Sequence, residues 1–426
     1  MYMDNLKLRS LIRTDWFVWV AFFCCPVLAM PMVINGCYRQ KKNMYLLFSL
    51  FMGLCAMLLY PPVADLYRHW VNFQDIKLFE WNDFLFFLGV NIKVDFLLPL
   101  LEFIFIKYGV SFGFLRFLLV ASTTMLFLNA YNSYCKSMKP NDRDRCVFLW
   151  FVIFIIPYAA VAVGLRSSFA ASLVSYYIFR HYVLNEKRFI DIGLLLIAFF
   201  FHFGVMMVIP LILLAEVGLY VRHKPIFYLV FGILFFVSQS FGLLVSVLPL
   251  GELNDYLVSY TEGEYASTEY LEGHNIFFWL PTIGHYTCNI LFFAIFCKNV
   301  PITKQTSLVY NLFLLTAFTS AFFAVNGRVM AYFYYYGIFF LMKYAGMSKL
   351  KVLFKTYVFL TLFGFMLEWR KHTITRWYYL FSPYPVALSM DYDDNWVMNN
   401  VNPNLNNFSS EVLHFLLQIP EVLKTL

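Results

Sequence analysis

Residues 163–213 indicate the class of the protein; they read VGLRSSFAASLVSYYIFRHYVLNEKRFIDIGLLLIAFFFHFGVMMVIPLIL. Long apolar segments lie on both sides of the basic turn NEKR, residues 185–188, and one imidazole, His202, interrupts the second of them. Apolar segments of this kind are typical of membrane-crossing helices, since a crossing needs about 20 residues. Basic residues stay on the cytoplasmic side of such helices, so the turn at 185–188 predicts a cytoplasmic loop.

The composition of the whole chain carries the same signal. Of its 426 residues, 61% are hydrophobic and 13% are charged, and the mean hydropathy is +0.66. Soluble domains hold roughly 45–50% apolar and about 25% charged residues. The chain has too few polar residues to cover a water-soluble globule, so the sequence predicts an all-α, polytopic transmembrane helix bundle. The net charge of +7 is accordingly assigned to membrane sidedness and not to nucleic-acid binding.

Apolar segments predict about twelve spans and one shorter helix. The stretch 95–109 carries Asp95, Glu102 and Lys107, a poor composition for a lipid-facing span, so it is interpreted as a re-entrant or interfacial helix. Residues 1–369 then form a transmembrane domain with external loops 63–94 and 250–275, and residues 370–426 form an extracytoplasmic tail with an amphipathic helix. The predicted spans are 15–34, 44–62, 112–131, 146–163, 168–184, 189–203, 204–220, 226–249, 276–297, 306–325, 329–345 and 352–369.

Loop charges set the predicted orientation. The loops assigned to the cytoplasm hold 18 basic and 5 acidic residues, and the other side holds 14 basic and 20 acidic ones, as the retention of Lys and Arg requires. The opening segment with Lys7, Arg9 and Arg13 departs from that rule. All eight cysteines lie in spans or at their cytoplasmic ends, so no disulfide framework is predicted. The cytoplasmic loops lie near 35–43, 132–145, 185–191, 221–225, 298–305 and 343–355.

The external loop 250–275 carries six acidic residues and neither Lys nor Arg. It has two readings. One is a solvated loop from which basic residues are excluded. The other is an acidic, Tyr-rich lid over a neutral carbohydrate, since Tyr rings stack on sugars and carboxylates bind hydroxyl groups.

Ionisable residues gather at four places on the predicted external face. Polar groups within or beside membrane spans are costly, and they usually have a function. The four places are PPVADLYRHW at 61–70, with Asp65, Tyr67, Arg68 and His69; VGLRSS, with Arg166; FFFHFG, with His202; and VNGRVM, with Arg328.

Each of these residues also has a structural reading. An Arg at a span end can be a snorkelling anchor, an isolated His among Phe residues can be a packing residue, and Asp65 can pair with Arg68. Arg on the outer face runs against the retention rule and needs a local reason, which an anionic ligand would supply, because a guanidinium binds phosphate oxygens in a bidentate fork. The pattern therefore predicts that Arg166 and Arg328 clamp a lipid pyrophosphate.

A proton acceptor for a hydroxyl group would complete such a site. His202, His69 and Asp65 are the candidate bases. The arginines would stabilise the charge that develops on the departing diphosphate. The prediction includes no metal and no cofactor.

The run 163–213 resembles the central block of the EpsG-type, Wzy-like polysaccharide polymerases. In that block an Arg opens a helix rich in small residues, a basic cytoplasmic turn follows, and a Phe-His pair lies near the end of the next helix. Three further elements carry the resemblance. The region of Asp65 and Tyr67 resembles the family's early Asp-and-Tyr segment. NGRVMAYF at 326–333 resembles its Asn-x-Arg element, and SPYPVAL at 382–388 resembles its closing Pro-Tyr signature. The chain departs from the family at Ser167, where Gln is usual, and at Phe203, where Pro is usual.

The resemblance implies a multi-pass glycosyltransferase-type polymerase of the bacterial inner membrane. Such enzymes join oligosaccharide repeat units carried on undecaprenyl pyrophosphate, in the assembly of a capsule, an exopolysaccharide or an O-antigen. Arg166 and Arg328 would hold the diphosphate, His202 and Asp65 would lie by the acceptor, and Arg68 and Tyr67 would bind substrate.

The implied partners are the lipid-linked oligosaccharide, membrane lipid, a chain-length regulator and a flippase, with no nucleic acid. Two alternatives stay open. One is a flippase or exporter of lipid-linked oligosaccharide, and the other is a membrane-bound acyltransferase that modifies the glycan.

Overall fold

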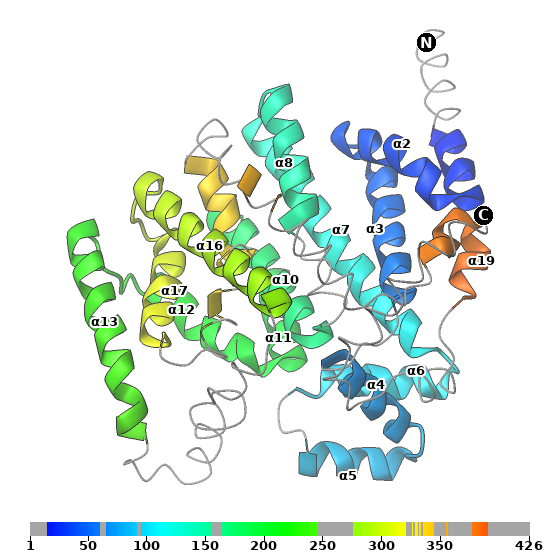
Figure 1. Ribbon diagram of the computed structural model, residues 1–426, viewed down its shortest axis with the longest axis horizontal. Helices are drawn as coiled ribbons and strands as arrows, with labels where there is room; N and C mark the ends of the chain where they lie inside the picture. The colour runs from blue at the N-terminus through cyan, green and yellow to red at the C-terminus, as the bar shows by residue number, and fades with distance from the viewer. Residues whose placement is uncertain are drawn as a thin grey trace. The chain divides into compact units, whose positions relative to one another are not determined.

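The computed structural model (Figure 1) describes residues 15–59, 65–91, 95–155, 164–186, 188–245, 276–320 and 377–390, with 326, 329, 330, 332, 333, 335–344, 355, 356 and 359. Within these ranges the chain forms helices joined by turns, and no β-strand. The predicted all-α class is confirmed for this part of the chain.

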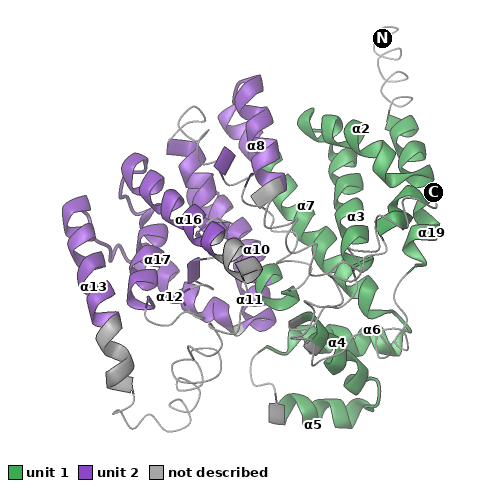
Figure 2. Ribbon diagram, in the orientation of Figure 1, with its two compact units in different colours: residues 1–132, 156–169, 365–426 green, residues 133–155, 170–364 purple. Residues whose placement is uncertain are grey.

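Two compact units make up the chain (Figure 2). The first holds residues 1–132, 156–169 and 365–426, and the second holds 133–155 and 170–364. The first contains the helical segment Asp15–Cys24, α2 (Pro26–Tyr38), α3 (Lys42–Met57), α4 (Asp65–Ile76), α5 (Trp81–Asn91), α6 (Leu97–Lys107), most of α7 (Phe112–Met138), the start of α10 (Leu165–Ile178), η3 (Trp377–Phe381) and α19 (Tyr384–Leu388). The second contains the rest of α7 and α10, with α8 (Asp142–Ile155), η1 (Phe179–Val183), α11 (Phe189–Phe201), η2 (Phe203–Met207), α12 (Val208–Glu216), α13 (Lys224–Val245), α16 (Ile276–Asn299) and α17 (Ser307–Phe318).

The first predicted span, 15–34, is two helices. The backbone leaves the helical conformation at Cys25, with φ −158° and ψ 97°, and α2 starts again at Pro26. Proline has no N–H to donate to the preceding turn, and its fixed φ suits the first position of a new helix. The prediction of one continuous helix is wrong at this point because hydropathy alone does not register Pro26.

Helices α3 and α7 approach closely at Gly53. A Cβ atom on Gly53 would lie 2.8 Å from the backbone oxygen of Phe117 and 3.1 Å from the Cβ atom of Ala121. Small residues allow such contacts between apolar helices, which gain van der Waals energy from the short separation. Gly53 therefore fixes the distance between α3 and α7 in the first unit.

Part of the predicted tail packs onto the first unit. The indole Nε1 of Trp377 in η3 donates to the backbone oxygen of Cys55 at 3.0 Å. The ring of Tyr384 in α19 lies 5.2 Å from that of Phe22, centroid to centroid. These contacts hold the chain's later residues against its first helices.

The segment from Asp65 to Lys107 forms three short helices around an aromatic cluster. Ile76, Phe84 and Phe103 are buried together, and the rings of Phe84 and Phe103 stack at 4.3 Å. Helices α4, α5 and α6 are about 16–18 Å long at 1.5 Å per residue, against roughly 30 Å for a hydrocarbon core. Helix α6 is thus too short to cross, in keeping with the interpretation of 95–109 as an interfacial or re-entrant helix.

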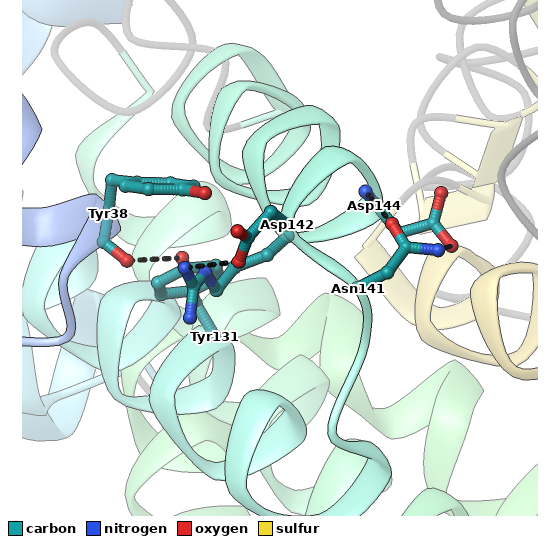
Figure 3. A network of polar contacts seen from close by, with 6 residues as sticks. Tyr38, Tyr131, Asn141, Asp142 and Asp144 are labelled. Carbon is teal, nitrogen blue, oxygen red and sulfur yellow. Dashed lines mark hydrogen bonds and ion pairs between the residues drawn. The ribbon is translucent and has the colours of Figure 1, made fainter.

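Helix α8 starts on a capping arrangement. Asn141 accepts a hydrogen bond from the Asp144 N–H at 2.8 Å, and its amide donates to the Asp144 carboxylate at 3.0 Å, as Figure 3 shows. The side chain of Arg145 reaches Asp142 at 2.7 Å. Acidic groups in the first turn also suit the positive end of the helix dipole. These interactions fix the start of α8 after the short turn that follows α7.

Among the described residues, one helix, α7, is long and apolar enough to cross a membrane by length and composition. Shorter apolar helices, among them Lys42–Met57, Phe189–Phe201 and Ser307–Phe318, overlap other predicted spans. The total of twelve spans stays a prediction. The external loop 250–275 and the predicted amphipathic helix after residue 390 lie outside the described residues. All eight cysteines are free.

We expect Gly53→Ala to lower the thermal unfolding temperature of the detergent-solubilised protein. The added methyl group meets a backbone oxygen that cannot rotate away, and overpacking of this kind costs about 1–3 kcal/mol. Gly89→Ala in α5 is the matched control, because a Cβ atom there meets nothing within 4 Å. Equal unfolding temperatures for Gly53→Ala and the wild type would contradict the close approach of α3 and α7.

Candidate functional site

The predicted site residues divide between the two units. Arg166 lies in the first turn of α10 and belongs to the first unit, as does α4, whereas His202 belongs to the second unit. Arg328 and the side chains of Asp65 and Arg68 lie outside the described residues. The prediction that all of these line one external cavity therefore stays a prediction, and each unit is considered by itself.

Arg166 is partnered by an acidic residue far away in the sequence. Its Nη1 atom lies 3.7 Å from Oδ2 of Asp95, and the two side chains are 36% and 17% exposed. The contact is longer than a good charge-assisted hydrogen bond of about 2.7–2.9 Å. Arg166 is thus held loosely and partly open to its surroundings.

A buried carboxyl group, Glu102, lies in the electrostatic reach of the same guanidinium. Glu102 is 1% exposed on α6, and its Oε1 atom has no hydrogen-bond partner among the residues that the structure describes. Burial raises the pKa of Glu102 from 4.5 to about 8, although the charge of Arg166 works in the opposite direction. This carboxyl group is therefore largely protonated at neutral pH.

Sequence reasoning missed the grouping of Asp95 and Glu102 with Arg166. From the sequence alone, the two acids indicate only that 95–109 is a poor span. The signal was a pair of acids in an apolar helix, which is costly unless a cation or a function compensates for it.

Helix α4 turns part of the predicted DLYRHW motif inward. His69 and Trp70 are each 4% exposed, and the half-buried ring of Tyr67 lies 5.6 Å from that of Trp70. Helix α4 packs against α6, the helix that carries Glu102. His69 thus belongs to the interior of the first unit.

Arg116 is a second buried cation that sequence reasoning missed. It is 1% exposed in α7, its Nη1 donates to the backbone oxygen of Leu59 at 2.6 Å, and it lies 6.0 Å from the Phe112 ring centroid. Leu59 lies two residues before Pro61, the first of the proline pair at 61–62 that leads to α4. Arg116 therefore fixes the chain at the entrance to the DLYRHW segment. The signal was its isolation among the apolar residues 112–120.

His202 occupies the tip of a helical hairpin formed by α11, η2 and α12. The His202 backbone is extended, with φ −154° and ψ 116°, so that α11 stops there and the 3₁₀ turn η2 begins. The predicted boundary between the spans 189–203 and 204–220 thus lies within two residues of the observed break. Helix breaks at membrane depth persist only where protein buries them or where they line a water-filled cavity.

The open end of this hairpin is fixed by ion pairs. Arg180 in η1 contacts Asp191 at 3.5 Å near the start of α11, and Glu216 at the end of α12 contacts His181 at 3.0 Å and Lys304 at 3.3 Å. Two loops predicted to be cytoplasmic, 185–191 and 298–305, therefore meet at one end of the second unit. His202 lies at the other end of α11, about 20 Å away at 1.5 Å per residue.

Gly204 makes room for the His202 imidazole. A Cβ atom on Gly204 would lie 3.0 Å from Nε2 and 3.2 Å from Cδ2 of His202, and 3.5 Å from the hydroxyl group of Tyr332. The Tyr332 ring in turn stacks on Tyr336 at 5.2 Å. The imidazole and the Tyr332 hydroxyl group thus approach the same small space, and Tyr332 lies four residues after Arg328 in the sequence.

The two arrangements suit different chemical tasks. Arg166, with one loose counter-ion, can exchange that partner for an anionic ligand, which a guanidinium binds in a fork. His202, at a break between helices, can accept or hold a proton. Among the residues that the structure describes, no three His, Cys, Asp or Glu side chains are grouped to hold a metal ion.

Comparison with known protein families matches residues 42–386 to the EpsG family. The match runs from the start of α3 into α19 and includes every predicted site residue. It confirms the resemblance drawn from the sequence motifs. No curated protein and no solved structure matches the chain.

The pKa of Glu102 predicts how stability changes with pH. Because this pKa is raised in the folded state, the folded protein binds the proton more tightly than the unfolded chain does. The protonated carboxyl group therefore contributes stability at low pH, and this contribution is lost as pH rises from about 4.5 through about 8. We expect the thermal unfolding temperature of the solubilised wild type to fall between pH 6 and pH 9, and that of Glu102→Gln to fall less. Glu80→Gln, at an 84% exposed side chain, should follow the wild type. Parallel curves for Glu102→Gln and the wild type would refute the buried proton.

Proposed function

This chain belongs to the EpsG family, and from that premise we propose that it is a glycan polymerase. Family membership makes it a membrane protein of polysaccharide biosynthesis. In the proposed reaction it joins oligosaccharide repeat units carried on undecaprenyl pyrophosphate, at the extracytoplasmic face of the bacterial inner membrane. Units have to reach that face and growth has to stop, so a flippase and a chain-length regulator are the proposed protein partners.

The observation that carries the proposal is the state of Arg166. The guanidinium is about one-third exposed, and its Asp95 contact is long, so an anion with better geometry can replace that carboxylate. A diphosphate offers several oxygens to the planar fork, and Arg keeps its charge at any working pH. The lipid tail of such a ligand suits a chain this apolar.

The proposed step transfers the growing chain from its carrier to a new unit. An acceptor hydroxyl oxygen attacks the anomeric carbon of the donor sugar, and the bond from that carbon to the diphosphate oxygen breaks. The diphosphate leaves with the bonding electrons, and the hydroxyl proton passes to a base. Arg166 and Arg328 are proposed to stabilise the leaving group, and Arg68 and Tyr67 to bind the substrate.

His202 and Asp65 are the proposed proton acceptors. The position of His202 supports its role, because the hairpin tip lies one helix length from the end where the basic loops meet. If that basic end lies at the cytoplasmic surface, an imidazole about 20 Å away lies within the bilayer thickness, nearer to the external face. Proton transfer by a positioned side chain contributes about 10²–10⁴-fold to a rate.

The two alternatives fit the geometry less well. A flippase or exporter serves both sides in turn, and such proteins often have internal repeats and sites at the membrane midplane, whereas the ion pairs of α11 and α12 gather at one end. A membrane-bound acyltransferase with a cytosolic donor would need its histidine accessible from the basic end, and His202 lies at the opposite end of α11.

We expect Arg166→Ala and Arg328→Ala each to abolish chain extension at normal protein abundance. Single repeat units should still reach the cell surface, because export precedes polymerisation, and gel analysis of the surface glycan would separate units from polymer. Arg143→Ala, at an exposed position in the first turn of α8, is the matched control and should make full-length polymer.

Two outcomes would contradict the polymerase proposal. Wild-type polymer from both arginine variants would remove the diphosphate clamp. Units trapped on the cytoplasmic leaflet after deletion of the chain would instead indicate a flippase.

We expect His202→Gln to slow polymer formation at least 100-fold if the imidazole is the base. Gly204→Ala should also slow it, because the new methyl group displaces the imidazole. Gly193→Ala in α11 is the control, since a Cβ atom there meets nothing within 4 Å. The readout is initial rate in membranes at equal protein abundance, and a fully active His202→Gln would leave His202 as a packing residue.

A further inference from the structure

Glu102 is a titratable group that the proposed reaction does not use. It lies on α6, in the same unit as Asp95 and Arg166. The exposed fraction is 36% for Arg166, 17% for Asp95 and 1% for Glu102. Within the described part of the chain its Oε1 atom has no hydrogen-bond partner, which is costly for a buried polar atom. Burying a carboxyl group near a proposed anion-binding site is costly, so Glu102 is expected to have a function there.

Other titratable groups lie on the helices around Glu102. Among the described residues, α4 packs against α6, and so does α5 through Phe84 and Phe103. Their titratable groups with described side chains are Tyr67, which is half-buried, His69, which is buried, and Asp75 and Asp83, which are exposed; Lys77, just after α4, and the Lys107–Glu80 pair are exposed as well. Arg166 is the cation whose charge acts on Glu102.

The protonation state of Glu102 decides the charge that an incoming anion meets. If Asp95 and Glu102 were both ionised, Arg166 would face two counter-ions. The three groups would then carry a net negative charge and repel a diphosphate. With Glu102 protonated, Asp95 is the one carboxylate among the described residues that pairs with Arg166, through a contact of 3.7 Å that a diphosphate can replace. Burial favours the protonated form, because it penalises the charged one.

We propose that Glu102 is a positioning residue that stays protonated in the working protein and leaves Arg166 with one replaceable counter-ion, so that the diphosphate headgroup binds. The inference rests on the proposed function, since it takes the diphosphate as the ligand of Arg166. Ionisation of Glu102 then switches binding off. A pKa of about 8 puts this switch just above neutral pH.

The test uses the full-length protein in lipid nanodiscs and undecaprenyl diphosphate as the probe, with binding measured at pH 7 and pH 9. We expect wild-type affinity to fall about tenfold over this interval, as one coupled proton with a pKa near 8 predicts. Glu102→Gln, which mimics the protonated form, should bind like the wild type at pH 7 and keep that affinity at pH 9. Glu80→Gln is the control and should lose affinity as the wild type does.

The outcomes separate this inference from the proposed function. Equal losses in the wild type and Glu102→Gln, or loss of binding by Glu102→Gln at pH 7, would overturn the role of Glu102 and leave the polymerase proposal standing. Unchanged binding in Arg166→Ala would instead overturn the diphosphate clamp itself.

Asp95→Asn provides a second variant in case Glu102→Gln does not reach the membrane. It should bind more tightly than the wild type at pH 7, because it removes the counter-ion, and should still weaken at pH 9. Binding by Asp95→Asn that is independent of pH would overturn the inference.

Discussion

The cost of placing a charge away from water governs the arrangement of this chain. Three arginines meet that cost in different ways. Arg116 is buried and donates to the backbone oxygen of Leu59 at 2.6 Å, and Arg180 contacts Glu186 at 3.0 Å and Asp191 at 3.5 Å. Both are held by the protein. Arg166 has a longer contact of 3.7 Å and about one-third of its side chain exposed, which is why it is the one of the three that we propose to bind a ligand.

The same constraint shapes the hairpin of α11, η2 and α12. Its charged groups, Asp191 and Glu216, lie at the ends where the basic loops meet, and the helices between them are apolar. His202 is the exception, and the backbone leaves the helix at that residue. A helix break and an ionisable side chain are both energetically costly within a membrane. Their occurrence at one position favours a functional site over a packing role. Gly204 is small because the imidazole occupies the space a side chain would need.

Local features of the fold were predictable from the sequence, and contacts between distant segments were not. The alternation of apolar segments with basic turns placed the break near His202 and the loops at 185–191 and 298–305, because hydropathy and loop charge act locally along the chain. The pairing of Arg166 with Asp95 joins residues 71 positions apart, and no local pattern records it. Arg116 was visible as a lone cation in an apolar run but was not singled out. Pro26 was overlooked because a hydropathy average does not weigh backbone geometry.

The proposed reaction requires Arg166 to exchange Asp95 for a diphosphate. The most direct measurement is an experimental structure of the full-length protein in lipid with undecaprenyl diphosphate bound. We expect diphosphate oxygens about 2.7–2.9 Å from the Arg166 guanidinium and a longer distance between Arg166 and Asp95. A diphosphate bound elsewhere, with Arg166 still in contact with Asp95, would contradict this proposal.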